Sequence, residues 1–234
     1  MTAFTERAYL GWVLDLGRVE FERVLGWQHG LVKLRKEGMA RDTIIFVEHP
    51  PVITVGKDGH PENFRDLGCR PVFIERGGDV TYHGPGQLVV YFIFNLSRRG
   101  RDIHRFMGNI QEGIIAALKE IGIDAKMGDE HTGVWVGDRK IASIGVAVTG
   151  WISFHGAAVN LNTDLRDFEQ ISPCGLDPKT MTSAAALLAG EVELGGFADS
   201  LLARYTDIFD TEFSRIELEE IAEDIESQAG GNVI

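Results

Sequence analysis

Apolar positions follow a helical spacing near the start of the chain and again after residue 100. The first set, with members three or four residues apart, is Phe21, Val24, Leu25, Leu31 and Val32. This spacing predicts a helix over residues 18–37, and Gly38 supplies a stop. A similar pattern predicts a second helix over residues 103–121, which Gly122 ends.

Between these helices the pattern changes to short runs rich in β-branched residues and bounded by proline and glycine. These runs are residues 42–50, 51–56, 70–78 and 88–96. They are typical of strands. The last run, LVVYFIFNL, is almost entirely apolar, which indicates a strand covered on both faces.

After the second helix, residues 133–137 and 140–148 predict a hairpin with its turn at Asp138-Arg139, and residues 151–162 hold a further strand. The last third is helical in pattern. Thr182 or Ser183 can cap an Ala/Leu segment. Apolar stripes then mark two more helices, with members Leu201, Leu202, Tyr205, Ile208 and Phe209, and later Leu218, Ile221, Ala222 and Ile225. Strands flanked by helices, with hairpins between some of them, favour an α/β or α+β fold.

The charge balance disfavours nucleic acid as a partner. The 234 residues include 23 basic and 35 acidic ones, a net charge of −12, and such a surface repels phosphate backbones. Residues 212–234 hold seven acids and one base, so we expect an acidic C-terminal helix over residues 213–234 that is attached to one domain over residues 1–212.

No run approaches 18 apolar residues and no signal peptide is visible, so we expect no membrane contact. Two cysteines fit a reducing, cytoplasmic environment.

A glycine-rich segment, RGGDVTYHGPGQ at residues 76–87, is the first candidate for chemistry. Its glycines let the backbone approach a ligand closely, and Arg76, Thr81, Tyr82 and His83 supply donors and acceptors. A glycine-rich hairpin without a ligand accounts for the composition equally well. The segment is neither a Walker loop nor a dinucleotide fingerprint.

Lys140 and Cys174 are the second and third candidates. A lysine at a strand end is usually solvated, but a desolvated lysine loses its proton readily and can act as an acid or base. Cys174 lies in a loop between proline and glycine, where a thiol needs a basic partner to become an effective nucleophile. The sequence leaves open whether Lys140 is that partner. Cys69, also in a loop, has no stronger claim.

Metal and serine-hydrolase sites are disfavoured by the spacing of the candidate ligands and nucleophiles. The seven histidines include no i, i+4 pair with a helical glutamate, the cysteines form no CxxC motif, and no GxSxG elbow occurs. We therefore expect neither a metal nor a cofactor.

Taken together, several segments resemble the octanoyltransferases of lipoic acid biosynthesis, also called lipoyl(octanoyl) transferases. In chain order they are EHPPV with Thr54-x-Gly56, RGGDVTYHGPGQLVVY at residues 76–91, GVWV and KIASIGV within residues 133–146, FHGAAVNLNTDL at residues 154–165, and ISPCG at residues 171–175. The long glycine-rich motif combined with Lys140 and the Pro-Cys-Gly loop is highly specific. The resemblance runs from about residue 44 to residue 176.

This resemblance implies a mixed sheet flanked by helices, similar to the catalytic domains of biotin and lipoate ligases. It implies transfer of an octanoyl group from octanoyl-acyl carrier protein to lipoyl domains of 2-oxoacid dehydrogenase E2 subunits and to the glycine cleavage H protein. The family's nucleophile corresponds to Cys174 and its acid/base lysine to Lys140. Its substrate-binding positions correspond to Arg76, Gly77, Gly78, Asp79, Val80, Thr81, Tyr82, His83, Ser143, Ile144, Gly145, Gly156, Ala157 and Ala158. Ala157 departs from the larger residue expected in many relatives.

The chemistry of the substrate agrees with that activity, because an acyl thioester is already activated and its transfer needs no ATP. We expect the Cys174 thiolate to attack the thioester while Lys140 holds and returns the proton. Backbone N–H groups of Gly77, Gly78 or Gly175 are expected to stabilise the oxyanion. His83 is expected to organise the substrate site.

Two alternatives stay open at this point. The first is an ATP-dependent lipoate or biotin ligase on the same fold, which ATP dependence would reveal. The second is a non-enzymatic scaffold that binds acyl groups or lipoyl domains, against which the presence of both Lys140 and Cys174 argues. Acyl carrier proteins are acidic, so we expect docking at an arginine cluster, although a solvated loop explains it as well. The cluster is Arg98, Arg99, Arg101 and Arg105.

Overall fold

An eight-stranded mixed sheet organises the computed structural model, which describes residues 9–64, 70–128 and 131–229, with the side chains of Cys174 and Ala229 left out. The strand order is β11-β1-β2-β6-β10-β9-β8-β7. The strands are β1 (Tyr9–Arg18), β2 (Asp42–Glu48), β6 (Gln87–Ile93), β7 (Lys126–Met127), β8 (Gly133–Val136), β9 (Arg139–Thr149), β10 (Ile152–Asn160) and β11 (Thr211–Arg215). β1 runs parallel to both β2 and β11, whereas the other pairs are antiparallel. The expectation of a mixed sheet is confirmed.

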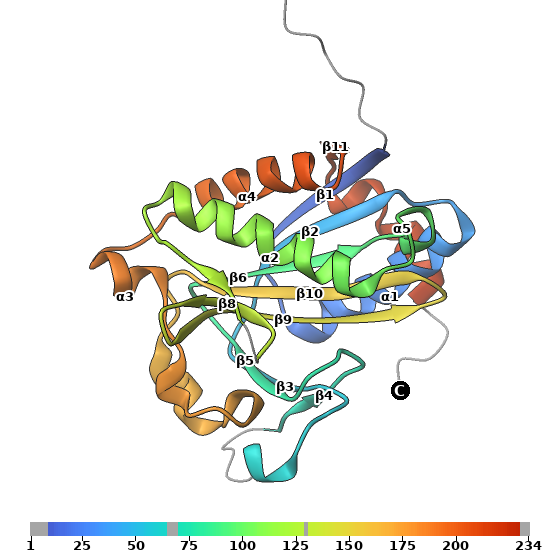
Figure 1. Cartoon of the computed structure of the whole chain (residues 1–234). Helices are drawn as coiled ribbons and strands as arrows, with labels where there is room; N and C mark the ends of the chain where they lie inside the picture. Colours follow the sequence, from blue (N-terminus) through green and yellow to red (C-terminus); the bar gives the residue numbers. More distant parts are fainter. Residues whose placement is uncertain (1–8, 65–69, 129–130, 230–234) are drawn as a thin grey trace, which may run out of the picture.

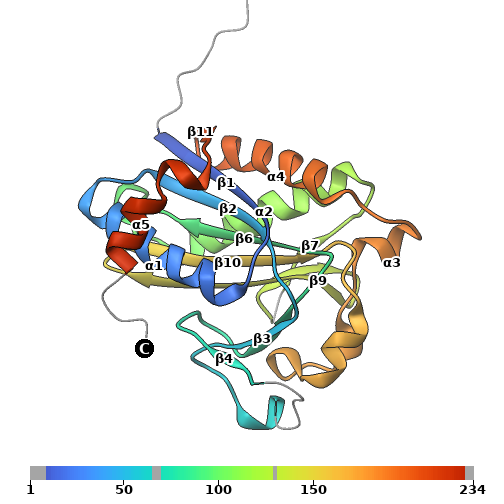
Figure 2. The same cartoon turned by 180° about the vertical axis from the view of Figure 1, so that it is seen from behind.

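Helices cover both faces of this sheet, as Figures 1 and 2 show. The helices are α1 (Phe21–Glu37), α2 (Ile103–Glu120), α3 (Ala184–Leu188), α4 (Leu194–Ile208) and α5 (Ala222–Ala229). Side chains of α2 and α4 pack with Phe46, Val90 and Phe92 on one face, and those of α1 pack with Ile45, Val89 and Tyr91 on the other. Every residue of β6 is buried, which confirms the strand covered on both faces.

Local capping explains where α1 ends and where α2 begins. Gly38 ends α1 with φ of 80°, in the left-handed region that glycine adopts without steric cost. The Asp102 carboxylate accepts a hydrogen bond from the Arg105 N–H at 2.9 Å and caps the start of α2. Both helices predicted from the apolar spacing are confirmed, although the first begins at Phe21 and residue 18 still belongs to β1.

A smaller sheet lies beneath the large one and carries the glycine-rich segment. Its order is β4 (Val72–Phe73), β3 (Val52–Val55) and β5 (Val80–His83). A separate apolar cluster, including Ile53, Val80, Phe168 and Met181, joins this sheet to the segment after β10. Short 3-10 turns shape the connections: η1 (Pro61–Asn63), η2 (Leu96–Arg98), η3 (Leu165–Gln170), η4 (Pro173–Gly175), η5 (Pro178–Thr180) and η6 (Leu218–Glu220). The turn η4, which contains the Pro-Cys-Gly residues, lies against β5 of the small sheet.

Three sequence predictions differ from the structure. β1 was not predicted, because its sequence YLGWVLDLGR mixes glycine and charge into a partly exposed strand. The β8–β9 turn is at residues 137–138, since Val136 pairs with Arg139. The helix expected over residues 213–234 begins only at Ala222, because Thr211–Arg215 form the polar edge strand β11 beside β1.

Among the described residues, the helices are too short or too polar to cross a membrane.

Candidate active site

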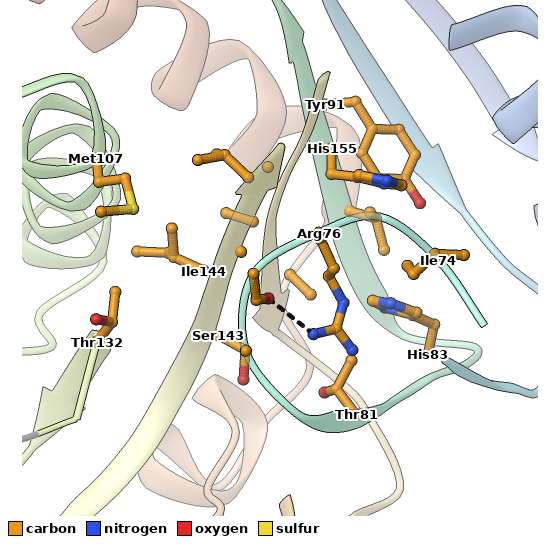
Figure 3. A pocket seen from close by; sticks show the side chains of 18 of the residues that line it. Ile74, Arg76, Thr81, His83, Tyr91, Met107, Thr132, Ser143, Ile144 and His155 are labelled. Carbon is orange, nitrogen blue, oxygen red and sulfur yellow. Dashed lines mark hydrogen bonds between the residues drawn. The ribbon is translucent and has the colours of Figure 1, made fainter. Parts of the chain in front are cut away.

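A cavity of about 420 Å³ lies between strands β9 and β10 of the large sheet and the loop that leads into β5 (Figure 3). Lys140 lines it, as do eleven of the fourteen residues predicted to bind substrate. These eleven are Arg76, Gly77, Gly78, Thr81, His83, Ser143, Ile144, Gly145, Gly156, Ala157 and Ala158. Three segments far apart in the sequence are thus brought to one cavity. Because Ala157 forms part of the wall, a larger residue there would narrow it.

The other three predicted residues, Asp79, Val80 and Tyr82, do not line the cavity. The Asp79 carboxylate accepts hydrogen bonds from the backbone N–H groups of His60 at 3.0 Å and Val80 at 2.7 Å. Val80 is fully buried in the small-sheet cluster. The Tyr82 hydroxyl donates to Asp167 at 2.6 Å. These three residues stabilise the glycine-rich segment through contacts with neighbouring loops and the small-sheet cluster, and they do not face the cavity.

Sequence reasoning missed nine residues that line the cavity: Phe21, Ile74, Val89, Tyr91, Met107, His131, Thr132, Val146 and His155. Several of them carried a signal. Tyr91 ends the long glycine-rich motif and His155 lies inside the FHG motif, so both were within segments already singled out. Phe21 and Met107 lie on apolar helix stripes, a pattern that is the same for a core residue and for a pocket wall.

Glycine at position 145 allows the loop to cross directly over the sheet. A Cβ atom there would lie 3.0 Å from the Gly77 carbonyl oxygen and 3.1 Å from Cδ of Arg76. The Gly77 N–H donates to the Val146 carbonyl at 3.0 Å and fixes the crossing. The Arg76 guanidinium then donates to the Thr54 carbonyl at 2.9 Å, which holds it over the cavity. The loop is therefore anchored to both sheets.

Lys140 is buried, with 3% of its surface exposed, so the solvated strand end considered from the sequence is not what the structure shows. Its Nζ lies 5.8 Å from the centroid of the Trp135 ring. Gly133 makes room for the lysine, since a Cβ there would come within 2.4 Å of its Cε. The Lys140 carbonyl accepts from the Thr182 N–H at 2.9 Å. Burial therefore removes most of the water from around this side chain.

Cys174 has its backbone in η4, while its side chain and the whole of Cys69 lie outside the described part of the chain. The Ser172 N–H donates to the Asn63 carbonyl at 2.8 Å, and η4 lies against β5. Seven residues after Cys174, Met181 forms a β-bridge with Lys140. The loop that carries the cysteine is thus tied at one end to the small sheet and at the other to the strand of the buried lysine.

The three backbone N–H groups expected to stabilise an oxyanion are all engaged. Gly77 donates to the Val146 carbonyl at 3.0 Å, Gly78 to the Asp58 carboxylate at 2.8 Å, and Gly175 to the Ser172 carbonyl at 3.0 Å. A donor already bonded to a protein acceptor is not directed at a reacting oxygen. Their role in stabilising an oxyanion stays a prediction, and it requires at least one of these bonds to be exchanged when the substrate binds.

Three buried histidines stand at or behind the cavity, and each is neutral. Desolvation, reinforced by the neighbouring His49, lowers the pKa of His83 to about 3, and the His83 ring also bonds through Nδ1 to the Gln87 side chain at 2.8 Å. Desolvation likewise lowers the pKa of His49 and of His155. These imidazoles can donate and accept hydrogen bonds but carry no charge at neutral pH.

Lowering the pH from 7 to 5 should therefore destabilise the protein. An unfolded histidine binds a proton below about pH 6.5, whereas folded His83 stays neutral until about pH 3, so the unfolded state binds more protons between these values. The loss from His83 alone is about 1.4 kcal/mol per pH unit below 6.5. Urea unfolding at several pH values measures it. His83→Gln should flatten the slope, and an unchanged slope in His83→Gln would contradict the assignment.

The arginine cluster expected to receive an acidic partner is split by the structure. Arg99 is not available at the surface, because its guanidinium pairs with Asp42 at 2.6 Å and donates to the Phe209 carbonyl at 2.8 Å. Arg101 lies over the Trp151 ring, beside the β9–β10 turn. At 3.3 Å per residue, that turn is about 30 Å along β9 from Lys140. The inclusion of Arg99 is therefore wrong, and Arg101 lies at the end of the sheet far from Lys140.

Comparison with known proteins places this chain in a family. The model of the lipoyl protein ligase A/B catalytic domain matches residues 21–206. The octanoyltransferase of Geobacter metallireducens is 41% identical over 210 residues, which cover 90% of this chain and 99% of that protein. The octanoyltransferase of Caldicellulosiruptor saccharolyticus is 42% identical over 220 residues, which cover 90% of this chain and 94% of that protein.

Two solved structures show the same fold at low sequence identity. A lipoate-protein ligase A bound with ATP has a TM-score of 0.75 at 17% identity, covering 94% of this chain and 92% of that one. A biotin protein ligase from Aquifex aeolicus has a TM-score of 0.51 at 13% identity, covering 94% of this chain and 78% of that one. The fold expected from the sequence motifs is confirmed. With its match to the catalytic-domain model and its identity to curated relatives, the chain belongs to the octanoyltransferases, a family of acyltransferases.

Proposed function

We propose that this protein transfers an octanoyl group from octanoyl-acyl carrier protein, through a thioester on Cys174, to the lysine of lipoyl domains. Octanoyl transfer in protein lipoylation follows from the family to which the chain belongs. The observation that carries the mechanism is the burial of Lys140 in the wall of a cavity whose other walls are largely apolar. The segment with Cys174 is tied to the backbone of the same lysine.

The cavity suits an acyl chain in size and in lining. Its volume of about 420 Å³ is within the range of small-molecule sites. Apolar side chains from β9, from α2 and from the segment after β4 contribute to it, including Ile144, Val146, Met107 and Ile74. Each methylene that leaves water is stabilised by about 0.8 kcal/mol, so an eight-carbon chain gains most of its binding free energy from such walls.

The first half-reaction moves the acyl group from the carrier to the enzyme. The Cys174 thiolate attacks the carbonyl carbon of the octanoyl thioester, a new carbon–sulfur bond forms, and the bond to the carrier sulfur breaks. Lys140 takes up the Cys174 proton beforehand and gives it to the leaving carrier thiolate. One thioester replaces another, so the step is nearly balanced in free energy and consumes no ATP.

The second half-reaction forms the stable product. The amine of the acceptor lysine attacks the acyl-enzyme, loses a proton to Lys140, and expels the Cys174 thiolate, which leaves an amide. The acceptors we propose are lipoyl domains of 2-oxoacid dehydrogenase E2 subunits and the glycine cleavage H protein. In Thermoplasma acidophilum, a lipoate protein ligase of the same fold belongs to a lipoylation system together with its E2 lipoyl domain.

Intact-mass spectrometry after mixing the protein with octanoyl-acyl carrier protein, without ATP, tests this proposal. The expected result is a gain of one octanoyl group that is absent in Cys174→Ala and retained in Cys69→Ala. Addition of a lipoyl domain should discharge the adduct and transfer the octanoyl group to the domain lysine.

Two results would overturn the proposal. An adduct that survives in Cys174→Ala but disappears in Cys69→Ala would move the nucleophile to the other cysteine. Transfer that appears only when octanoate and ATP are supplied, with no adduct on the enzyme, would establish an ATP-dependent ligase instead.

A further inference from the structure

His155 has an unusual backbone conformation for a residue inside a strand. Its φ is 58°, in the left-handed region that residues other than glycine rarely occupy, although it lies in β10 and lines the cavity. Such strain persists only where surrounding contacts support it, and it is concentrated at functional sites. A specific contact must therefore hold His155 in place.

The left-handed backbone changes the face of the sheet that His155 occupies. Directly opposite residues of an antiparallel pair share a face, and the residue opposite His155 is Val146, which packs on the α2 side. The His155 ring instead lies 4.8 Å from the ring of Phe154 and 6.3 Å from that of Tyr91, both of which pack on the α1 side. Figure 3 shows the imidazole beside Tyr91 in the wall of the cavity. The left-handed backbone conformation of His155 therefore places its imidazole on the α1 side of the pocket.

Gln28 of α1 supplies the contact that supports the His155 backbone, whereas the Glu75 carboxylate lies 3.6 Å from Nε2 of the ring. The side-chain oxygen of Gln28 accepts the backbone N–H of His155 at 2.8 Å, and Gln28 is fully buried. Its Nε2 has no hydrogen-bond partner within the described part of the chain. Burying an amide with a donor left unsatisfied costs free energy, and an apolar side chain would avoid that cost. Among the contacts described for the Gln28 side chain, the bond to the His155 N–H explains why a glutamine and not an apolar residue occupies this position.

We propose that Gln28 is a positioning residue for octanoyl transfer, which holds His155 in its left-handed conformation so that the imidazole forms the α1-side wall of the acyl pocket. This role rests on the proposed function. Val146, opposite His155, is six residues from Lys140 along β9, or about 20 Å at 3.3 Å per residue. A change at Gln28 therefore alters the pocket wall and not the reacting groups, so it should affect binding of the acyl donor more than the rate at saturation.

Gln28→Met tests the role, because methionine keeps the length and flexibility of the side chain and loses the amide oxygen. Loss of one hydrogen bond that supports a strained residue should raise KM for octanoyl-acyl carrier protein about tenfold and change kcat less than about twofold. Gln28→Glu retains an acceptor oxygen and should restore KM to within about threefold of the wild type. Leu31→Val, a buried substitution one turn along the same helix, controls for a general loss of packing.

Coupling to His155 separates positioning from a merely structural effect. In a His155→Ala background, Gln28→Met should add nothing to the rise in KM, because the imidazole it positions is gone. Additive effects of the two substitutions would overturn the proposal, as would a fall in kcat with KM unchanged. If Gln28→Met does not fold, hydrogen exchange of the His155 N–H in the wild-type protein decides the same question.

Hydrogen exchange in the free wild-type protein provides a readout that does not depend on activity. The His155 N–H should exchange slowly in the wild type and much faster in Gln28→Met, with the amide of Val146 as an internal reference. Rapid exchange of the His155 N–H in the wild type would overturn the role of Gln28. Absence of octanoyl transfer by the wild type would overturn the proposed function alone, since the exchange result stands by itself.

Discussion

Lys140→Met should lower kcat for octanoyl transfer by about 10²–10⁴-fold, the usual contribution of a positioned general acid or base. Methionine has nearly the same length as lysine and fits beside Trp135 and Gly133, so the cavity keeps its shape. Lys140 is 3% exposed, and methionine fills the same buried volume. The loss is therefore expected in the rate and not in the fold.

Steady-state kinetics with octanoyl-acyl carrier protein and a lipoyl domain, together with urea unfolding, measure both quantities. Single-turnover experiments should show that formation and discharge of the acyl-enzyme are both slowed, because the same amine moves a proton in each half. Lys179→Met, at an exposed position in η5 near the same strand, is the matched control and should keep full activity. A fall in kcat of less than about threefold in Lys140→Met would remove Lys140 from the mechanism.

Asp42→Asn should destabilise the protein by about 3–5 kcal/mol, the range for breaking a buried ion pair by removing one partner. The Asp42 carboxylate, 3% exposed, accepts from Arg35 at 2.7 Å, from Arg99 at 2.8 Å and from the Asn95 N–H at 2.9 Å. The asparagine has nearly the same shape but no charge. Two guanidinium groups, each 10% exposed, are then left without their carboxylate.

The urea midpoint and slope of Asp42→Asn give this loss directly. Asp164→Asn is the matched control, because it removes the same charge from an exposed pair with Arg166, and its loss of stability should be much smaller than that of Asp42→Asn. Equal losses in the two variants would show that the buried network around Asp42 contributes little. Because Arg99 also bonds to Phe209 and Thr211, the destabilisation should be accompanied by faster hydrogen exchange in β11.

Part of the fold could be predicted from the sequence because its determinants are local. The stops at Gly38 and Gly122, the cap at Ser183 and the apolar run of β6 each depend on residues within a few positions of one another. Strands β1 and β11 could not be predicted in this way. Their residues pair with partners far along the chain, and β11 is a polar edge strand whose composition resembles a helix or loop.

The chemical types at the site were determined by the sequence: a cysteine between proline and glycine, a lysine entering a strand of small residues, and a glycine-rich segment with a histidine. Tertiary structure decided what each group does, because burial and hydrogen-bond partners come from segments far apart. It buried Lys140, occupied the N–H groups of Gly77, Gly78 and Gly175, and drew Arg99 into contact with Asp42. It also held His155 in a left-handed conformation through Gln28, 127 positions earlier in the chain, a contact that no local pattern encodes.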